Sequence, residues 1–548
     1  MRTRTKLTAA ALMTALSAAA AGCDTESLEV APEDMTKPGE GKWDSSVEAL
    51  FVDMDFDGTL FSTSSFNPQQ TIQNQMLYTI GHLNGDRSVG RLDRLTLTDI
   101  RTTPVSGGVE ISYHARMPVA WGKSKTNVPS TYTFTLPHDV SFSGLESFTG
   151  KYMSSCVDFG AHEVSSGNMW YYFRPNRSGC TIADADVVDV EATVSVSSIN
   201  TTGKYPEYDK VWEDGALKVV SIFGKYEDGA TSSGDAGISA YNEFIGDVQS
   251  ELRAQGLSFT TVPASVPFNP GVAMPDIAFS ATLPDGKKVE IVALLVDNVR
   301  TPPSWFSPRY SALSTRADII AYNGHAGLGS NVRALARMGV WTAGQYLMLF
   351  MNGCDTYAYV DGFLAQARAA VNSDDPTGTK YMDIVTNAMP AFFHSDSNAT
   401  MAFVRGLLGY AQPLTYEKIF TAIDRSQVVL VSGEQDNVFV PGGGGGGGGD
   451  TNWGGLTRSG TVVKNQENRV ATPLLAAGTY LFELSGTSDA DLYVRVGQEP
   501  TTTLYDCRPF KAGSSEVCEV SLSSAAVVHV MVRGWASSSS FTLEGSKR

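Results

Sequence analysis

Short runs of alternating apolar and polar residues fill the stretch from Glu48 to about Tyr208. Examples are "GGVEISYHARM", "STYTFTLP" and "VDVEATVSVSS". A period of two residues sends successive side chains to opposite faces of a strand, so that one face is buried and the other is solvated. Gly, Asn, Asp and Ser separate the runs, as they do at turns. We therefore predict a β-rich domain over residues 48–208.

The pattern changes at Asp209, where unbroken apolar runs replace the alternation. "KKVEIVALLVD", "ADIIAYNG" and "QYLMLFMNG" have this form, and amphipathic stretches such as "AGISAYNEFIGDVQSELRAQG" lie between such runs. Strands buried on both faces and alternating with helices indicate a parallel sheet covered by helices. We predict an α/β domain with a mostly parallel sheet over residues 209–440.

The C-terminal part of the chain again has the period of strands. "PGGGGGGGGDTNWGG" at residues 441–455 predicts a flexible linker, because consecutive glycines hold no single backbone conformation. Beyond it, "GTYLFELSG", "DADLYVRVG" and "VVHVMVRGW" predict a β-sandwich over residues 456–548. The polar residues 24–47, which include Pro and Gly, predict a tether near the other end.

The first 23 residues have the features of an export signal. Arg2, Arg4 and Lys6 precede the short apolar run "LTAAALMTALSAAAAG". The small residues before Cys23 in "AAGC" resemble the lipobox of bacterial lipoproteins, which implies lipidation of Cys23. Ala20 stands where Leu is usual, so ordinary cleavage after an alanine is the alternative. We expect an exported protein, held in the cell envelope by its lipid or extracellular.

Length and charge narrow the classes of function. A chain of 548 residues exceeds what one hydrophobic core can hold, which predicts three or four domains. The net charge of −17 leaves no basic face to neutralise phosphates. Nucleic acid is therefore not an expected partner, and membrane contact is expected only through the N-terminal lipid.

Export makes the cysteines informative, because closely spaced cysteines pair in an oxidising compartment. We predict two disulfides, Cys156 with Cys180 and Cys507 with Cys518. With Cys23 lipidated, Cys354 is left over. Such a thiol is either a nucleophile or a small buried apolar residue.

Cys354 and His325 follow two of the predicted strands. "ADIIAY" ends in Asn323-Gly324-His325 and "QYLMLF" ends in Asn352-Gly353-Cys354. The carboxyl ends of neighbouring parallel strands gather ligands and reacting groups at one edge of a sheet. A nearby imidazolium and the N-terminus of a helix expected near Tyr357 would favour the thiolate. The sequence thus predicts a Cys-His dyad.

The two strand ends with their following turns, Asn323-Gly324-His325 and Asn352-Gly353-Cys354, are called the two corners below. They resemble the caspase-like fold cysteine peptidases, which include gingipains, clostripain and legumain. The resemblance spans about residues 209–440. It implies that Cys354 is the nucleophile, that His325 carries the proton, and that the backbone N–H groups of Cys354 and Ala326 face the oxyanion. Two departures leave the subfamily open: Ala326 stands where Gly is common, and Asn352-Gly353 precedes the cysteine.

Three acidic residues are candidates for supporting roles. Asp297, at the end of "EIVALLVD", is the best-placed carboxylate to orient the imidazole, with a solvated strand end as the alternative. Asp355 and Asp361 either face a substrate pocket or cap the following helix.

"FVDMDFDGTLF" contains two competing motifs. Asp55 and Asp57 resemble the nucleophile motif of haloacid-dehalogenase-like phosphatases, but a β-rich region follows them. Asp53, Asp55, Asp57 and Gly58 match the start of an EF-hand loop, whose twelfth position is here Ser64. An acidic surface turn is the default interpretation. The scattered histidines predict no metal site.

The C-terminal segment has a resemblance of its own. "DADLYVR" and the two cysteines around "RPFKAGSSEV" resemble the bacterial pre-peptidase C-terminal domain, a small β-sandwich attached to many secreted proteases. The resemblance implies secretion and surface or substrate binding. Asp489 and Asp491 are candidate calcium ligands, with cross-strand and turn roles as the alternative; no other cofactor is expected.

Together these patterns predict an exported cysteine endopeptidase. Its mechanism would be attack of the Cys354 thiolate on a peptide carbonyl, a thioester intermediate, and protonation of the leaving amine by His325. The alternative is a surface lipoprotein without catalytic activity that binds protein or polymer through its β domains.

Overall fold

The computed structural model of the chain describes residues 44–161, 163–359, 362–434, 437, 439–441, 453–473, 475–522 and 526–548. The predicted signal at 1–23, the predicted lipidation site Cys23, and Asp361 lie outside the described residues. So do most of the predicted tether at 24–47 and most of the glycine-rich linker at 441–455.

The β-rich region is built on an antiparallel sheet in the order β3-β5-β2-β7-β6, with β4 also paired to β5. β2 pairs with β5 along its whole length, from Leu50 opposite Trp121 to Ser62 opposite Val109. The elements of this region are β2 (Leu50–Ser62), α1 (Pro68–Asn84), β3 (Val89–Gly90), β4 (Thr96–Val105), β5 (Gly108–Trp121), β6 (Thr131–Pro137), α2 (Phe142–Tyr152), α3 (Met169–Tyr172) and β7 (Val187–Val196).

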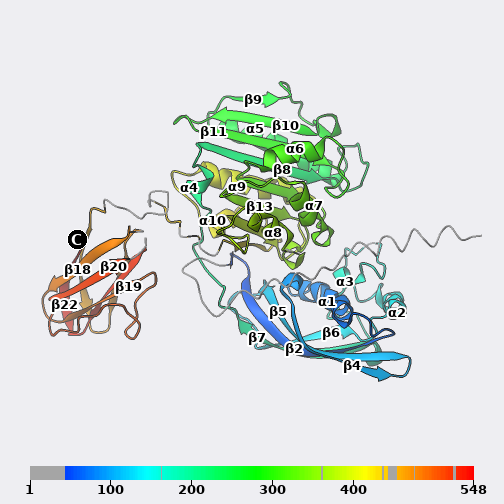
Figure 1. The fold of residues 1–548 in the computed structure, drawn as a ribbon, viewed down its shortest axis with the longest axis horizontal. Helices are drawn as coiled ribbons and strands as arrows, with labels where there is room; N and C mark the ends of the chain where they lie inside the picture. The colour runs from blue at the N-terminus through cyan, green and yellow to red at the C-terminus, as the bar shows by residue number, and fades with distance from the viewer. Residues whose placement is uncertain are drawn as a thin grey trace, which may run out of the picture. The chain divides into compact units, whose positions relative to one another are not determined.

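Helix α1 packs against this sheet and was not predicted from the strand pattern (Figure 1). Its first turn is defined by Asn67, whose side chain accepts from the Gln70 N–H, and by Pro68 in the first helical turn. Its buried face includes Ile72, Met76, Ile80 and Leu83, which recur every three or four residues. The helix ends at Asn84, and this end lies at the functional cleft described below.

The α/β region is built on a mixed sheet in the order β1-β15-β14-β13-β12-β8-β11-β10-β9. Its elements are β1 (Ser45–Ser46), α4 (Tyr208–Val211), β8 (Ala216–Gly224), α5 (Ala236–Ala254), β9 (Phe259–Val262), β10 (Asp276–Thr282), β11 (Lys288–Val296), α6 (Phe306–Ser314), β12 (Ile319–Asn323), α7 (Ser330–Met338), β13 (Leu347–Asn352), α8 (Phe363–Ala369), β14 (Met382–Asn387), α9 (Phe393–Leu408), α10 (Tyr416–Phe420) and β15 (Val429–Gly433). One apolar core joins the sheet to α5, α9 and α10, and a second joins its other face to α6, α7 and α8 (Figure 1).

The parallel part of this sheet is narrower than predicted. The strands β14, β13, β12, β8 and β11 run parallel, whereas β15, β1, β10 and β9 add antiparallel pairs at the two edges. β10 and β11 are joined by a tight turn in which Leu283 N–H donates to Lys287 O and Gly286 takes a φ of 92°. β1 lies within the predicted tether, and its Ser45 pairs with Val431 of β15.

The C-terminal region is a β domain of two packed sheets, β16-β22-β18-β20 and β17-β21-β19. Its strands are β16 (Leu456–Val463), β17 (Glu467–Ala471), β18 (Gly478–Gly486), β19 (Ala490–Val496), β20 (Glu516–Leu522), β21 (Val528–Gly534) and β22 (Ser538–Lys547). Alternate residues such as Tyr480, Phe482, Leu492 and Val494 fill the space between the sheets. The chain is therefore multidomain and β-rich, with a C-terminal β domain, as predicted.

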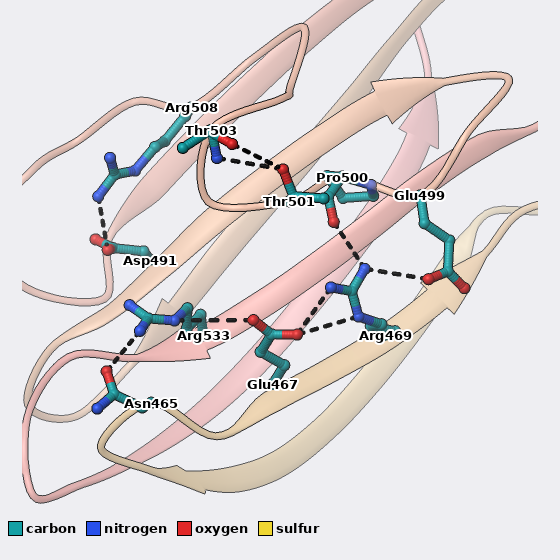
Figure 2. A network of polar contacts seen from close by, with 10 residues as sticks. All are labelled: Asn465, Glu467, Arg469, Asp491, Glu499, Pro500, Thr501, Thr503, Arg508 and Arg533. Atoms are coloured by element: carbon teal, nitrogen blue, oxygen red, sulfur yellow. Dashed lines mark hydrogen bonds and ion pairs between the residues drawn. The ribbon is translucent and has the colours of Figure 1, made fainter. Parts of the chain in front are cut away.

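A polar network lies on β17, β19 and β21 of the C-terminal domain (Figure 2). The carboxylate of Glu467 accepts from Arg469 at 2.8 Å and lies 3.9 Å from Nε of Arg533. Glu467 and Arg533 are also cross-strand partners in the antiparallel register. These charges therefore stabilise the pairing of the strands on the surface of the domain.

The β-rich and α/β regions share one hydrophobic core. Tyr357, Ala388 and Leu430 of the α/β region are buried among the core residues of the β-rich region. The ring of Tyr357 lies 6.0 Å from that of Phe51 in β2. Residues separated by hundreds of positions can therefore meet at a single site. Among the described residues, no helix combines the length and the apolar character needed to cross a membrane.

Candidate functional site: an aromatic cleft at the strand ends

The two predicted corners do lie side by side. Asn323 at the end of β12 pairs with Asn352 at the end of β13, and Gly324 N–H donates to Asn352 O at 3.2 Å. A Cβ on Gly353 would lie 2.8 Å from Gly324 O and 3.3 Å from the backbone N of Ala326. Only glycine therefore allows these two loops to approach so closely.

A buried hydrogen-bond network, made mostly of amide side chains, holds the two corners in place. Asn352 donates from Nδ2 to Asn323 Oδ1 at 2.9 Å and to Asp396 Oδ1 at 3.1 Å. Its own Oδ1 accepts from Asn387 and from Gln427, each at 3.0 Å. All of these side chains are buried away from water. An amide left without a partner there would lower the stability of the fold, so these hydrogen bonds are important. The network fixes the ends of three neighbouring strands.

His325 and Cys354 project from these corners but have separate partners. His325 is exposed, and its Nε2 lies 3.0 Å from Tyr226 O. Cys354 is half-buried, and its Sγ donates to Ala391 O at 3.5 Å. Within the described part of the chain, no hydrogen bond joins the imidazole to the thiol.

The environment of Cys354 favours the neutral thiol. Burial, and to a smaller extent the neighbouring Asp355, raise the pKa of Cys354 to about 12, and hydrogen bonds to Tyr171 and Ala391 oppose this shift only in part. The expected helix N-terminus is also absent at this position: a short 3-10 turn, Thr356–Tyr359, follows the cysteine, and α8 starts only at Phe363. A thiolate is favoured by a lowered pKa and by a helix N-terminus beside the sulfur, and the surroundings of Cys354 provide neither.

The supporting carboxylates have other roles. Asp297 lies 2.6 Å from Nζ of Lys225 and accepts from Gly229 N–H at 3.1 Å, and these hydrogen bonds lower its pKa. It is therefore a surface ion-pair partner of Lys225 and does not orient His325. Asp355 is fully buried with a φ of 52° and accepts from Asn84 Nδ2 at 3.0 Å. Burial raises its pKa to about 7.

Around the corners lies a cleft of about 720 Å³ with an aromatic lining. The α/β region contributes His325, Ala326, Cys354 and the segment 389–393, and the β-rich region contributes a second wall. The aromatic side chains of the lining are Trp170, Tyr171, Tyr172, Tyr226, Tyr359, Phe392 and Phe393. The rings of Tyr226 and Phe393 lie 5.4 and 5.3 Å from the imidazole of His325, so the histidine belongs to this aromatic surface.

The wall from the β-rich region was missed in the sequence. Apart from Asn84 and Arg87, this wall lies within the loop closed by the disulfide between Cys156 and Cys180, whose S–S distance is 2.01 Å. The run "MWYYFRP" in this loop was the available signal, because four consecutive aromatic residues bring a large aromatic surface to one short segment. Both predicted disulfides are present; the second joins Cys507 to Cys518 with Cα atoms 5.8 Å apart.

The acidic motif near the N-terminus is not a turn. Asp55 and Asp57 lie inside β2 and hold His114 of β5 between them, each at 2.9 Å from one ring nitrogen. The hydrogen bond to Asp57 raises the pKa of His114. Asp53 pairs with Arg116 at 3.3 Å. The default interpretation as an acidic surface turn was therefore wrong, because these carboxylates are cross-strand partners.

The other proposed calcium ligands are also engaged within the fold. Asp491 lies 3.0 Å from Nη2 of Arg508, and Asp489 accepts from Gly513 N–H at 3.1 Å (Figure 2 shows the first pair). In the described residues, no group of three or more His, Cys, Asp or Glu side chains is arranged to hold a metal ion.

Comparisons with known proteins match the C-terminal domain. Residues 474–534 match the family model of the bacterial pre-peptidase C-terminal domain, so the predicted resemblance is confirmed. The chain is 44% identical over 72 residues to the neutral protease of Vibrio proteolyticus, a match that covers 13% of this chain and 12% of the relative. It is 44% identical over 68 residues to the zinc metalloprotease of Helicobacter pylori, covering 12% of this chain and 27% of the relative.

A serine protease and a solved structure give similar matches. The alkaline serine exoprotease A of Vibrio alginolyticus is 43% identical over 61 residues, or 11% of each chain. The solution structure of vEP C-ter 100 is 37% identical, covers 15% of this chain and 83% of its own, and has a TM-score of 0.14. The chain thus spans about a quarter or less of the length of these curated relatives.

These findings correct the predicted cysteine endopeptidase. Two of these relatives are named a zinc metalloprotease and a serine exoprotease, they match in the C-terminal domain, and they give no support to a cysteine peptidase. The raised pKa of Cys354 favours its neutral thiol, and among the described residues no hydrogen bond joins this thiol to His325. The Cys-His mechanism was therefore wrong. The error has a physical origin: the sequence predicted the adjacent strand ends but not the partial burial of Cys354 beside Asp355, which raises the pKa of the thiol.

Proposed function

We propose that the protein is an exported polypeptide-binding protein that holds segments of protein chains in the aromatic cleft. The cleft itself carries the proposal. Its volume of about 720 Å³ lies within the range of small-ligand sites, and its lining combines many aromatic rings with polar side chains such as Asn168, Arg174 and His325. Aromatic side chains give large contact areas at low entropic cost, as in protein-binding surfaces.

The C-terminal domain supports polypeptide as the class of ligand. Its relatives are named as proteases, whose substrates are proteins, and one of them, from Xanthomonas campestris, is named an extracellular protease. The signal-like N-terminus and the two disulfides support export, and "AAGC" supports anchoring through a lipid on Cys23. The parallel strands from β14 to β11, with their carboxyl ends at the cleft, support a caspase-like architecture for residues 209–440.

Charge further restricts the peptide. The protein carries a net charge of −17, which repels anionic chains and attracts basic ones. The charged residues of the cleft lining are Arg87, Arg174 and Asp158, so the cleft itself does not favour basic peptides, and neutral peptides with bulky apolar side chains fit its aromatic lining best.

Fluorescence anisotropy with labelled ten-residue peptides of this kind tests the proposal. Phe393→Ala and Tyr172→Ala remove rings from opposite walls of the cleft, and each should weaken binding about tenfold, which is about 1.4 kcal/mol. Tyr505→Ala, which removes a partly exposed ring of the C-terminal domain, is the matched control and should leave binding unchanged. Equal affinity of all four proteins would refute binding in the cleft. The same assay shows whether bound peptides are hydrolysed.

A further inference from the structure

A second hollow lies beside helix α5 of the α/β region and shares no lining residue with the aromatic cleft. Its volume is about 440 Å³, which is within the range of small-ligand sites. Among the described residues that line it, none is basic. Helix α5 contributes Asn242, Glu243, Gly246 and Asp247, and the loop between β9 and β10 contributes Phe268.

Phe268 presents an aromatic ring at this hollow. The residue is 86% exposed, so its ring is left open to solvent. Pro267 precedes it and Pro270 follows two positions later, and each proline ring fixes a backbone φ angle. An aromatic side chain in such a restrained loop loses little conformational entropy when a ligand covers it. Phe268 therefore provides a flat apolar surface for a ligand.

Asn242 supplies a hydrogen-bond donor in a fixed orientation. The residue is only 7% exposed, and its Oδ1 accepts from Gly271 N–H at 2.8 Å. This bond assigns Nδ2 as the free end of the amide, and within the described part of the chain Nδ2 has no hydrogen-bond partner. Because a buried donor requires an acceptor, and Asn242 lines the hollow, a ligand bound there can supply that acceptor.

Glu243 and Asp247 supply hydrogen-bond acceptors. They are four residues apart on α5, a spacing at which two carboxylates are neighbours and repel each other. Asp247 Oδ2 accepts from the hydroxyl of Ser397 at 2.7 Å. Neither carboxylate forms an ion pair with a lysine or arginine of the described chain. Both can therefore accept hydrogen bonds from a ligand in the hollow.

Gly246 keeps the surface of the helix open between these carboxylates. Glycine in the interior of a helix lowers its stability relative to alanine. A Cβ at this position would meet no atom within 4 Å, so the packing of the fold does not require glycine here. The missing side chain instead leaves space for a ligand on the helix.

The lining discriminates between classes of ligand. An organic cation would face the donor of Asn242, and an anion would face two carboxylates. A purely apolar ligand would leave all three polar groups unpaired. A sugar meets each requirement, because its hydroxyl groups both donate and accept hydrogen bonds and the C–H face of its ring is apolar and can pack on an aromatic ring.

We propose that this hollow binds a neutral saccharide. The sugar ring stacks on Phe268, and its hydroxyl groups accept from Asn242 Nδ2 and donate to Glu243 and Asp247. Gly246 makes room for the sugar against the helix. The site is separate from the aromatic cleft, so saccharide binding does not depend on whether the cleft binds peptide.

A glycan array of neutral oligosaccharides, incubated with labelled full-length protein, tests the proposal. The oligosaccharides that bind are then titrated in solution by saturation-transfer NMR, which gives their dissociation constants. Saturation should reach the ring C–H protons most strongly, because these protons lie on Phe268. Spermidine as the organic cation and glucuronate as the anion should not compete. Absence of any binding to the array, or competition by either of these compounds, would overturn the proposal.

Variants assign the binding to this hollow. Phe268→Ala should weaken the binding of these oligosaccharides about tenfold, because the stacking surface is lost. Phe66→Ala is the matched control, since Phe66 is also 86% exposed but lies outside the hollow. Gly246→Ala should weaken binding several-fold while raising the urea midpoint of unfolding, because alanine stabilises the helix and its methyl group occupies the hollow. Equal affinity of Phe268→Ala and the parent would refute the site.

Discussion

Asn84, at the end of α1 in the β-rich region, donates a hydrogen bond to Asp355, which follows Cys354 in the α/β region, at 3.0 Å. The two residues are 271 positions apart, and both are buried. The same Nδ2 also donates to Ser88 O at 3.1 Å. The Asn84–Asp355 hydrogen bond therefore links the β-rich region to the α/β region beside the aromatic cleft.

Loss of this contact should destabilise the protein. Asn84→Ala leaves Asp355 buried without its donor, so the free energy of unfolding should fall by about 1–3 kcal/mol. Urea denaturation monitored by tryptophan fluorescence measures the change. Asn74→Ala, a half-buried position on the same helix, is the control and should cost less. Equal losses in the two variants would show that the Asp355 contact contributes nothing specific.

The thiol of Cys354 should react slowly at neutral pH. Because its pKa is raised to about 12, the rate of alkylation by iodoacetamide should rise about tenfold for each pH unit between 7 and 9. His325→Ala should leave this rate unchanged, because no hydrogen bond joins the two side chains. Mass spectrometry of the labelled protein gives the rate. A plateau near pH 7, or a collapse of the rate in His325→Ala, would restore an activated thiolate.

The buried pair of Lys204 and Asp383 should be sensitive to removal of one partner. Lys204→Met leaves an uncompensated buried carboxylate, which should lower the free energy of unfolding by about 3–5 kcal/mol. The double variant Lys204→Met/Asp383→Asn removes both charges and should recover part of the loss. Denaturant unfolding of the parent and of these two variants provides the comparison. If the double variant were less stable than Lys204→Met, the loss in the single variant would not come from an uncompensated charge on Asp383.

The disulfide between Cys156 and Cys180 should shape the cleft. It closes a loop with a sequence separation of 24 that carries Trp170 and Tyr172. Replacing both cysteines with alanine should cost about 2–4 kcal/mol of stability and weaken peptide binding, because the wall becomes less ordered. Replacing Cys507 and Cys518 instead should leave the affinity for peptide unchanged. Anisotropy titrations of both double variants test this difference.

Local periodicity was enough to predict the kinds of domain. Alternation predicted strands in the β-rich and C-terminal regions, and the unbroken apolar runs predicted β12 and β13 with His325 and Cys354 at their ends. The antiparallel strands at the edge of the α/β sheet were harder to predict from the sequence. "DIAFSAT" and "KKVEIVALLVD" are joined by a tight turn, and periodicity alone does not reveal on which side of a sheet a hairpin will be added.

The environment of the thiol could not be predicted in the same way. It depends on Tyr171, which comes from the other region and reaches Cys354 only after the two regions dock. Neither spacing nor charge pattern encodes a contact between residues so far apart in the chain. A cysteine at a strand end therefore suggested catalysis, while the docked aromatic loop makes it part of an apolar surface.

Photo-crosslinking shows whether polypeptide binds in the aromatic cleft. A neutral ten-residue peptide carrying benzoylphenylalanine is bound to the full-length protein, irradiated, and its attachment sites are mapped by mass spectrometry. We expect crosslinks at residues 170–172 and 389–393, the two walls of the cleft, and their loss when unlabelled peptide competes. Crosslinks confined to the C-terminal domain, residues 453–548, would contradict it.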